Sequence, residues 1–331
     1  MLADMERFLL HSAEVSRIGL GTWAIGGMEW GEVSDGDAIA SCLAIFEHGI
    51  NLIDTAPIYG HGRAEELVGR AMRHHGKRES FYIATKAGLE WNERGVFANS
   101  DPVRLRQEFE DSLRRLDTEY VDLYQIHWPD TTIPVERAAE VLLGLFEEGK
   151  IRAIGVSNFS AAQMEAFQSV APLHSNQPPY NLFERAIDEE ALPYCREHGI
   201  AVLTYSSLCR SLLAGRMTRE MKFPEGDVRL VDPKFQPPQF AQYLNAVDRL
   251  KEFARERYGK TVLELAARWV LDRPGVSAAL WGAKRPEQLH AVDGIFGWKL
   301  DEAAMAEMDG IVRESVTDPV GPEYLTPGVR D

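Results

Sequence analysis

The strongest constraint on the fold of this chain is a regular alternation of short apolar runs with longer amphipathic stretches. The runs are often β-branched, and most are flanked by Gly, Pro, Ser or Asn, which is typical of strands buried in a parallel sheet. Eight strands are therefore predicted, at Ile18–Trp23, Asn51–Asp54, Phe81–Lys86, Val121–His127, Ala153–Ser157, His174–Gln177, Ala201–Ser206 and Ser277–Trp281.

The amphipathic stretches between these runs predict helices, and several carry end signals. Asp101 is an N-cap acceptor followed by Pro102 at the first helical position. Gly49, Gly149 and Gly199 each end a helix just before a predicted strand, as C-cap chemistry prefers. The predicted helices are Asp35–His48, Ala64–His74, Asp101–Leu116, Val135–Glu148, Ser160–Val170, Ile187–His198 and Thr261–Leu271.

Strands that alternate with helices, without a linker-like stretch, predict an α/β fold: one closed (β/α)8 TIM barrel in which residues 1–331 form a single domain. Length alone would suggest two domains, but the repeat argues against that division. Arg7–Val15 precedes the first barrel strand and is expected to form a hairpin that closes the bottom of the barrel. Cys209–Phe240 is a long connection after the seventh strand, on the face where barrel active sites lie. The Pro- and Gly-rich tail Ser315–Asp331 is expected to lie across the surface.

Charge and composition exclude several classes of function. The chain has 36 Lys and Arg against 51 Asp and Glu, a net charge of −15, which argues against a nucleic-acid partner. No apolar window is long enough to span a membrane and no export signal is visible, so a cytoplasmic protein is expected. Three scattered cysteines and histidines without H-x-H or H-E-x-x-H spacing predict neither a disulfide framework nor a metal site.

Four polar side chains fall where a barrel active site would lie. Asp54, Lys86 and His127 end the second, third and fourth predicted strands, and Tyr59 follows in the loop after Asp54. Because parallel strands of a barrel end at one rim, these four side chains can converge on one mouth. Each alone has an ordinary structural explanation, such as helix capping, but the four together are hard to explain as packing.

This set of side chains permits the reduction of a carbonyl group. A phenol with a pKa near 10 is a weak acid at neutral pH, and a neighbouring ammonium such as Lys86 is expected to lower the pKa of Tyr59. Asp54 would keep Lys86 charged, and a neutral His127 could donate a hydrogen bond to the substrate oxygen. The set contains no nucleophile and no metal cage, so the reducing equivalent has to come from a cofactor.

Three long motifs resemble those of the aldo-keto reductases. They are Gly49-Ile-Asn-Leu-Ile-Asp54-Thr-Ala-Pro-Ile-Tyr59-Gly60, Leu113-Arg-Arg-Leu-Asp-Thr-Glu-Tyr-Val-Asp122-Leu-Tyr-Gln-Ile-His127-Trp-Pro and Gly149-Lys150-Ile-Arg-Ala-Ile-Gly155-Val-Ser157-Asn158-Phe. The resemblance runs from about Arg7 to Trp298. Tyr205-Ser-Ser-Leu-Cys-Arg210, Asp232-Pro-Lys-Phe-Gln and Asp318-Pro-Val-Gly-Pro-Glu are similar to the bacterial branch of general-stress and inositol-associated reductases.

The resemblance implies an NADPH-dependent reductase of small aldehydes or ketones, or the reverse oxidation, with NADP(H) as cofactor. It implies Tyr59 as proton donor, supported by Lys86, Asp54 and His127. Substrate would meet Trp23, Tyr59, His127 and Trp128, of which Trp128 is either a pocket wall or rim packing. The cofactor would meet Thr22, Trp23, Asp54, Ser157, Asn158, Gln177, Tyr205, Ser206, Ser207, Leu208, Cys209, Arg210, Arg216, Arg229, Gly282, Ala283, Lys284, Arg285 and Gln288.

The phosphate end of this cofactor site is also supported by the residues themselves. Gly282 follows the eighth strand and precedes the helix start Arg285-Pro-Glu, a combination typical of anion sites. Lys284 and Arg285 add the local positive charge that a polyanionic ligand needs. Many members of the family have Pro at Ser207, Gly at Ser211 and Asn at Asp293, so this chain departs from the pattern at the adenosine end.

The sequence also permits two other interpretations. Gly19-Leu-Gly21-Thr-Trp-Ala24 matches the Rossmann fingerprint, but no helix is predicted directly after it, so a strand end that lets a ligand approach is preferred. Some barrels that resemble this family act as nucleotide-sensing subunits of ion channels, and such a non-turnover binding role is the alternative to an enzyme.

Overall fold

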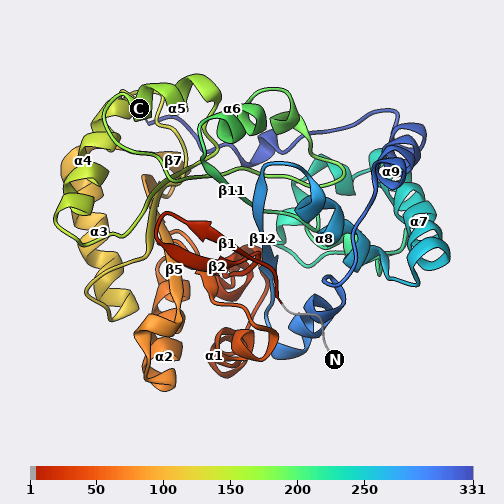
Figure 1. Ribbon diagram of the computed structural model, residues 1–331, viewed down its shortest axis with the longest axis horizontal. Helices are drawn as coiled ribbons and strands as arrows, with labels where there is room; N and C mark the ends of the chain where they lie inside the picture. The colour runs from red at the N-terminus through yellow and green to blue at the C-terminus, as the bar shows by residue number, and fades with distance from the viewer. Residues whose placement is uncertain (1–4, 331) are drawn as a thin grey trace.

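The computed structural model describes residues 5–330, and its centre is a closed barrel of parallel strands (Figure 1). The neighbour order around the barrel is β10-β11-β12-β3-β4-β5-β8-β9. The eight barrel strands are β3 (Ile18–Gly21), β4 (Leu52–Asp54), β5 (Tyr82–Ala87), β8 (Leu123–Ile126), β9 (Ile154–Ser157), β10 (Ser175–Gln177), β11 (Ala201–Thr204) and β12 (Val276–Gly282). All eight coincide with predicted runs, so the predicted (β/α)8 barrel is confirmed.

Helices surround the barrel, and their ends follow local chemistry. Asp101 caps α3 through the backbone N–H groups of Val103 and Arg104, with Pro102 in its first turn. Thr261 and Glu264 form a reciprocal capping box on α8. The α-helices are α1 (Asp35–Ala44), α2 (Arg63–His75), α3 (Pro102–Leu116), α4 (Val135–Glu147), α5 (Ala161–Gln168), α6 (Ala191–Glu197), α7 (Gln239–Tyr258), α8 (Val262–Asp272) and α9 (Glu302–Ser315).

The predicted N-terminal hairpin is present as β1 (Arg7–Leu10) and β2 (Ala13–Ser16), paired antiparallel. In Figure 1 it lies, in red, across the middle of the ring of strands. Leu10 and Val15 are buried against Leu52, Tyr82 and Leu123, which begin or lie near the beginning of their strands. The hairpin therefore closes the amino-terminal end of the barrel and leaves the carboxyl-terminal end for ligands.

Three elements of the structure were not predicted. The long connection ends in the 20-residue helix α7, and the helix α9 follows the last barrel strand. Neither helix is one of those predicted between the eight strands. A second hairpin, β6 (Leu89–Asn92) and β7 (Gly95–Ala98), extends the loop after β5. Among the described residues 5–330, no helix combines the length and apolar character needed to cross a bilayer.

The C-terminal tail lies across the surface, as expected, with residues 317–330 partly or fully exposed, and it is also held to a neighbouring hairpin. Gly328 accepts a hydrogen bond from the Ala98 N–H (3.3 Å) and donates one to the Val96 carbonyl (2.9 Å), so the tail is fixed to the β6–β7 hairpin. Residues 324–328 of this tail line a cavity at the carboxyl-terminal end of the barrel. The backbone pairing was not visible in the sequence because it joins segments that are far apart along the chain.

Candidate active site

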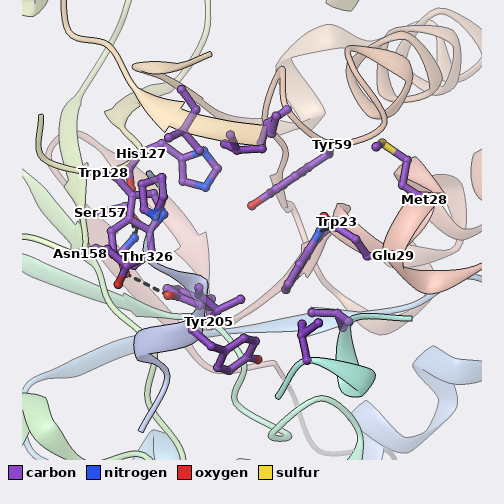
Figure 2. Close-up of a pocket in the computed structure, with 18 of the residues that line it drawn as sticks. Trp23, Met28, Glu29, Tyr59, His127, Trp128, Ser157, Asn158, Tyr205 and Thr326 are labelled. Carbon is purple, nitrogen blue, oxygen red and sulfur yellow. Dashed lines mark hydrogen bonds between the residues drawn. The ribbon is translucent and has the colours of Figure 1, made fainter. Parts of the chain in front are cut away.

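The four polar side chains singled out from the sequence meet at one point of the barrel rim. Asp54 is the last residue of β4, Lys86 lies near the end of β5, and His127 directly follows β8. Lys86 Nζ lies 2.6 Å from Asp54 Oδ1 and 3.1 Å from the Tyr59 hydroxyl. The Tyr59 and His127 rings meet edge to face with centroids 5.8 Å apart. Figure 2 shows the Tyr59 hydroxyl and the His127 ring directed into the same cavity.

Lys86 and Asp54 form a fully enclosed ion pair with few free hydrogen-bonding positions. Lys86 also donates to the Thr55 carbonyl (3.0 Å), and the second Asp54 oxygen accepts from the amides of Gln177 (2.8 Å) and Gln125 (3.3 Å). Burial lowers the pKa of Lys86, while the Asp54 carboxylate opposes that shift. The pair is held rigidly beneath the Tyr59 hydroxyl.

The expectation that Lys86 lowers the pKa of Tyr59 is wrong for this arrangement. Burial raises the pKa of Tyr59 well above its usual value, and the carboxylates of Asp54 and Glu29 add to the rise. Burial, helped by the Lys86 charge, also holds the pKa of His127 well below its ordinary value. Near neutral pH the phenol is therefore protonated and the imidazole is uncharged, so both can donate a hydrogen bond.

The position of Tyr59 is set by a close approach of two glycine backbones. A Cβ at Gly26 would lie 2.7 Å from the Tyr59 carbonyl carbon, and one at Gly60 would lie 2.3 Å from the Gly26 oxygen. Gly60 also has a φ of +63°, which side chains disfavour. Gly26 and Gly60 therefore let the Tyr59 loop pack onto the segment after β3.

A cavity of about 530 Å³ opens in front of the Tyr59 hydroxyl. All four residues expected to meet substrate, Trp23, Tyr59, His127 and Trp128, line it. Its walls also contain residues that were not predicted, because they come from loops and short elements outside the barrel strands, whose side-chain directions have no sequence signal. These are Met28, Glu29, Ile58, His61, Leu89, Val96, Gly226, Asp227, Val228, Leu230, Val231, Tyr324, Leu325, Thr326, Pro327 and Gly328.

A second hollow, of about 170 Å³, runs from the same point toward β12. We call it the cofactor groove because most of the residues expected to bind the cofactor line it. It shares Trp23, Tyr59, Gln177 and Tyr205 with the cavity, so the two hollows meet at Tyr59. Residues expected to meet the cofactor that line the groove are Thr22, Trp23, Asp54, Gln177, Tyr205, Ser206, Ser207, Leu208, Arg210, Gly282, Lys284 and Gln288.

Where the two hollows meet, Asn158 links several of the expected cofactor residues. Its side chain donates to the His127 carbonyl (3.0 Å) and the Ser157 hydroxyl (3.1 Å), and it accepts from the Tyr205 hydroxyl (2.9 Å). Figure 2 shows the bond between Asn158 and Tyr205 as a dashed line. Ser157 in turn donates to the Gln177 carbonyl (2.6 Å). Ser157 and Asn158 line the cavity beside this junction.

Five other residues expected to meet the cofactor do not line the groove. Cys209 and Ala283 are buried in the apolar core, so their side chains face away from it. Arg216 and Arg285 are exposed, and Arg285 lies 3.9 Å from Asp37. Arg229 instead pairs with Asp227 (2.6 Å), and its guanidinium lies over the rings of Trp30 and Phe223.

Arg210 reaches the groove but its guanidinium belongs to a buried ion cluster. We define this cluster as Glu184, Arg210, Asp232 and Lys234, whose side chains are at most 1% exposed. Arg210 contacts Glu184, and its Nε lies 2.7 Å from Asp232. The guanidinium therefore already has two carboxylate partners, which the sequence did not reveal because those partners lie far away along the chain.

The expected phosphate end has cations, but its donors already have partners. The Gln288 side chain accepts from the backbone N–H of Lys284 (2.7 Å) and of Arg285 (3.1 Å), and the Lys284 ammonium donates to the Trp30 carbonyl. The segment after Arg285 is the 3-10 helix Pro286–Gly294 and not an α-helix. Asp293 pairs with His48 (2.7 Å), which occupies its carboxylate.

Within residues 5–330, no group of three or more His, Cys, Asp or Glu side chains is arranged to hold a metal ion. At the rim, the Tyr59 hydroxyl and the His127 ring lie beside the Lys86–Asp54 pair and can donate hydrogen bonds.

Comparisons with known proteins agree on one family. The model of the aldo/keto reductase family matches residues 17–313. The aldo-keto reductase YhdN of Bacillus subtilis is 51% identical over 318 residues, 96% of each chain. The NADH-specific methylglyoxal reductase of Escherichia coli is 36% identical, over 86% of this chain and 91% of that protein.

Among solved structures, the glycerol dehydrogenase from Gluconobacter oxydans superposes with a TM-score of 0.87 at 47% identity, over 97% of this chain and 99% of that one. These relatives give no support to the alternative of a nucleotide-sensing subunit. The chain belongs to the aldo/keto reductase family and is an oxidoreductase that uses a nicotinamide cofactor to reduce carbonyl groups or to oxidise alcohols.

Proposed function

We propose that the protein reduces small aldehydes or ketones with NADPH, or runs the reverse oxidation, and that Tyr59 is the proton donor. The observation that carries the proposal is the contact of the Tyr59 hydroxyl with Lys86 Nζ (3.1 Å) at the point where the cavity and the cofactor groove meet. A carbonyl carbon held there would face the groove while its oxygen faced the phenol. We also propose that residues 1–331 act as one unit, because both hollows are built on the one barrel.

The residues lining the groove and the adjoining part of the cavity fit a nicotinamide cofactor. The amide side chains of Asn158 and Gln177 and the Ser157 hydroxyl can bind a carboxamide, and the Tyr205 ring offers a flat wall for a heterocycle. A Cβ at Gly282 would meet nothing within 4 Å, which leaves room for a ligand beside the backbone. The bound cofactor supplies the hydride.

Tyr59 and His127 would act on the carbonyl oxygen. As negative charge develops there, His127 donates a hydrogen bond and the Tyr59 hydroxyl transfers its proton, so the product is an alcohol and Tyr59 is left as a phenolate. Lys86, charged and held by Asp54, lies within hydrogen-bonding distance of that phenolate oxygen. The raised pKa of Tyr59 keeps the phenol protonated near neutral pH, so its proton is available when negative charge develops on the carbonyl oxygen.

We propose NADPH as the preferred cofactor because Lys284 lines the far end of the groove and can contact a 2′-phosphate. Its ammonium would exchange the Trp30 carbonyl for the phosphate. The NADH-specific relative indicates that members of this family differ in cofactor preference, so the preference has to be measured for this chain.

The role of Tyr59 is tested by Tyr59→Phe, with Tyr258→Phe on α7 as the matched control. Tyr59→Phe should lower kcat for reduction of a short aldehyde by about 10²- to 10⁴-fold while the Kd for NADPH stays within about twofold. Tyr258→Phe should retain the parent activity, since Tyr258 packs against Trp298 away from both hollows. Survival of turnover within a few fold in Tyr59→Phe would remove the assignment.

A further inference from the structure

The charges around the substrate cavity are unevenly distributed. Among the described residues that line it, none is lysine or arginine, whereas Glu29 and Asp227 carry carboxylates. Asp227 is neutralised, because the Arg229 guanidinium binds it in a bidentate manner at 2.7 and 2.6 Å. Within residues 5–330 Glu29 has no ion-pair partner. Of the two carboxylates at the cavity wall, Glu29 is therefore the one whose negative charge is not neutralised.

Glu29 lies close to the reacting groups. It belongs to the short 3-10 helix Met28–Trp30, and its Oε2 accepts the indole N–H of Trp23 at 2.8 Å. The Trp23 ring is in turn stacked on the Tyr59 ring, with centroids 6.3 Å apart. The charge of Glu29 contributes to the raised pKa of Tyr59, so its field extends to the phenol. Figure 2 shows Glu29, Trp23 and Tyr59 along one side of the cavity.

An anionic group on a substrate would find no compensating partner in this cavity. Its walls include Ile58, Leu89, Val96 and Val228, which cannot solvate a charge. Lys86, beneath Tyr59, is already paired with Asp54 at 2.6 Å. The Arg229 guanidinium is likewise already bound to Asp227. Burying a carboxylate or phosphate here would therefore cost its hydration and add repulsion from Glu29.

We propose that Glu29 is a specificity-determining residue that makes the cavity select uncharged carbonyl substrates and reject those that carry a carboxylate or phosphate. The inference rests on the proposed function, since it concerns the substrates of the same site. It assigns Glu29 an electrostatic role and no part in the hydride or proton transfer. The cavity volume of about 530 Å³ admits neutral aldehydes and ketones up to the size of a substituted aromatic ring.

The test uses two aldehydes of the same shape, 4-carbamoylbenzaldehyde (neutral) and 4-carboxybenzaldehyde (anionic), with the parent enzyme, Glu29→Gln and Glu32→Gln. Glutamine keeps an oxygen that can accept the Trp23 N–H, so only the charge is removed. Glu32→Gln makes the same change of net charge on a residue that is exposed, as Glu29 is, but that does not line the cavity. The measured quantity is the ratio of kcat/KM for the neutral aldehyde to that for the anionic one, in which electronic differences cancel between variants.

We expect the parent enzyme to favour the neutral aldehyde by about tenfold at low salt, and Glu29→Gln to reduce that ratio about threefold to fivefold, as for a partly screened charge. Glu32→Gln should change it by less than about 1.5-fold, and added salt should shrink the parent ratio. Equal kcat/KM for the two aldehydes, or an unchanged ratio in Glu29→Gln, would overturn the proposal. Failure of the parent to reduce either aldehyde with NADPH or NADH would instead contradict the proposed function.

Discussion

Lys234 Nζ lies 2.8 Å from Glu184 Oε1, with the lysine fully buried and the glutamate 1% exposed. This pair joins the long connection after β11 to the loop after β10, and Lys234 also donates to the Gly321 carbonyl (2.9 Å) in the C-terminal tail. Residues 226–228, 230 and 231 of the connection and 324–328 of the tail contribute walls of the cavity. The buried ion cluster thus holds the long connection and the C-terminal tail together where both form walls of the cavity.

Lys234→Met should strongly destabilise the protein, because it leaves Glu184 buried with one cation fewer. Removing one partner of a buried pair typically costs about 3–5 kcal/mol. Urea titration measures this loss of stability as a decrease in the free energy of unfolding. Lys251→Met is the matched control, since Lys251 pairs with Asp248 on the exposed face of α7 and should cost less than about 1 kcal/mol. Similar losses for the two variants would contradict a structural role of the cluster.

Gly26→Ala should impair catalysis more than stability. The new Cβ would lie 2.7 Å from the Tyr59 carbonyl carbon, so the loop that carries the phenol has to shift. Displacement of a catalytic group by about 1 Å can cost about 10²-fold in rate, whereas overpacking costs about 1–3 kcal/mol. Steady-state kcat and thermal melting measure the two effects. Gly36→Ala on α1, whose Cβ would meet only Ser34 Oγ at 3.9 Å, should leave kcat unchanged.

The barrel and the four rim residues were predictable because their signals are local. A buried parallel strand is a short apolar run, and a polar residue at its carboxyl end, such as Asp54 or Lys86, has its place on the rim fixed by topology. The motif resemblance added Ser157, Asn158 and Gln177, which meet around Tyr205.

The cavity walls and the partners of the cations could not be predicted. Arg210 and Arg229 look alike in sequence, yet Arg210 is buried against Glu184 and Arg229 binds Asp227. The partner of each arginine depends on how the long connection after β11 packs against the rest of the protein, and no local sequence pattern encodes that packing. For the same reason the raised pKa of Tyr59 was missed, since it depends on burial and on Glu29 from another loop.

The rate of carbonyl reduction should be nearly independent of pH between about 6.5 and 8.5. The pKa of His127 lies well below 6.5, so the imidazole is already neutral throughout that range, and the pKa of Tyr59 lies well above 10, so the phenol stays protonated. We expect kcat/KM with a neutral aldehyde to vary by less than about twofold. A tenfold fall in kcat/KM for each unit of rising pH, with an apparent pKa between 6 and 8, would show that a charged His127 is required.

Glu108 should make the protein lose stability as pH rises. Burial raises its pKa to about 7 from an ordinary value of 4.5, although Arg104 and the Gly88 N–H oppose the rise. Between these two values the unfolded chain releases a proton that the folded protein retains, so unfolding becomes easier by up to about 3 kcal/mol. Glu108→Gln should therefore gain stability relative to the parent from pH 4.5 to pH 8 in urea titrations. A constant difference between the two proteins over that range would contradict the raised pKa.

Lys284→Ala should weaken the binding of NADPH much more than the binding of NADH. The Lys284 ammonium lines the groove, whereas Arg285 is exposed outside it, so Lys284 is the cation expected to meet a 2′-phosphate. A charged hydrogen bond of this kind is worth about 1.5–3 kcal/mol, which corresponds to a rise in the Kd for NADPH of about 10- to 100-fold. The Kd for NADH should change by less than about threefold in fluorescence titrations.

The matched control for that experiment is Lys299→Ala, which removes the same charge at the opposite end of the barrel, beside Arg7 and Arg17. It should leave both dissociation constants within about twofold, because charges separated by more than a Debye length of about 8–10 Å are largely screened. Arg285→Ala should resemble this control more than Lys284→Ala, because Arg285 does not line the groove. If Lys284→Ala weakened the binding of NADPH and NADH equally, Lys284 would contact a part of the cofactor that both dinucleotides share. That result would refute the proposed preference for NADPH.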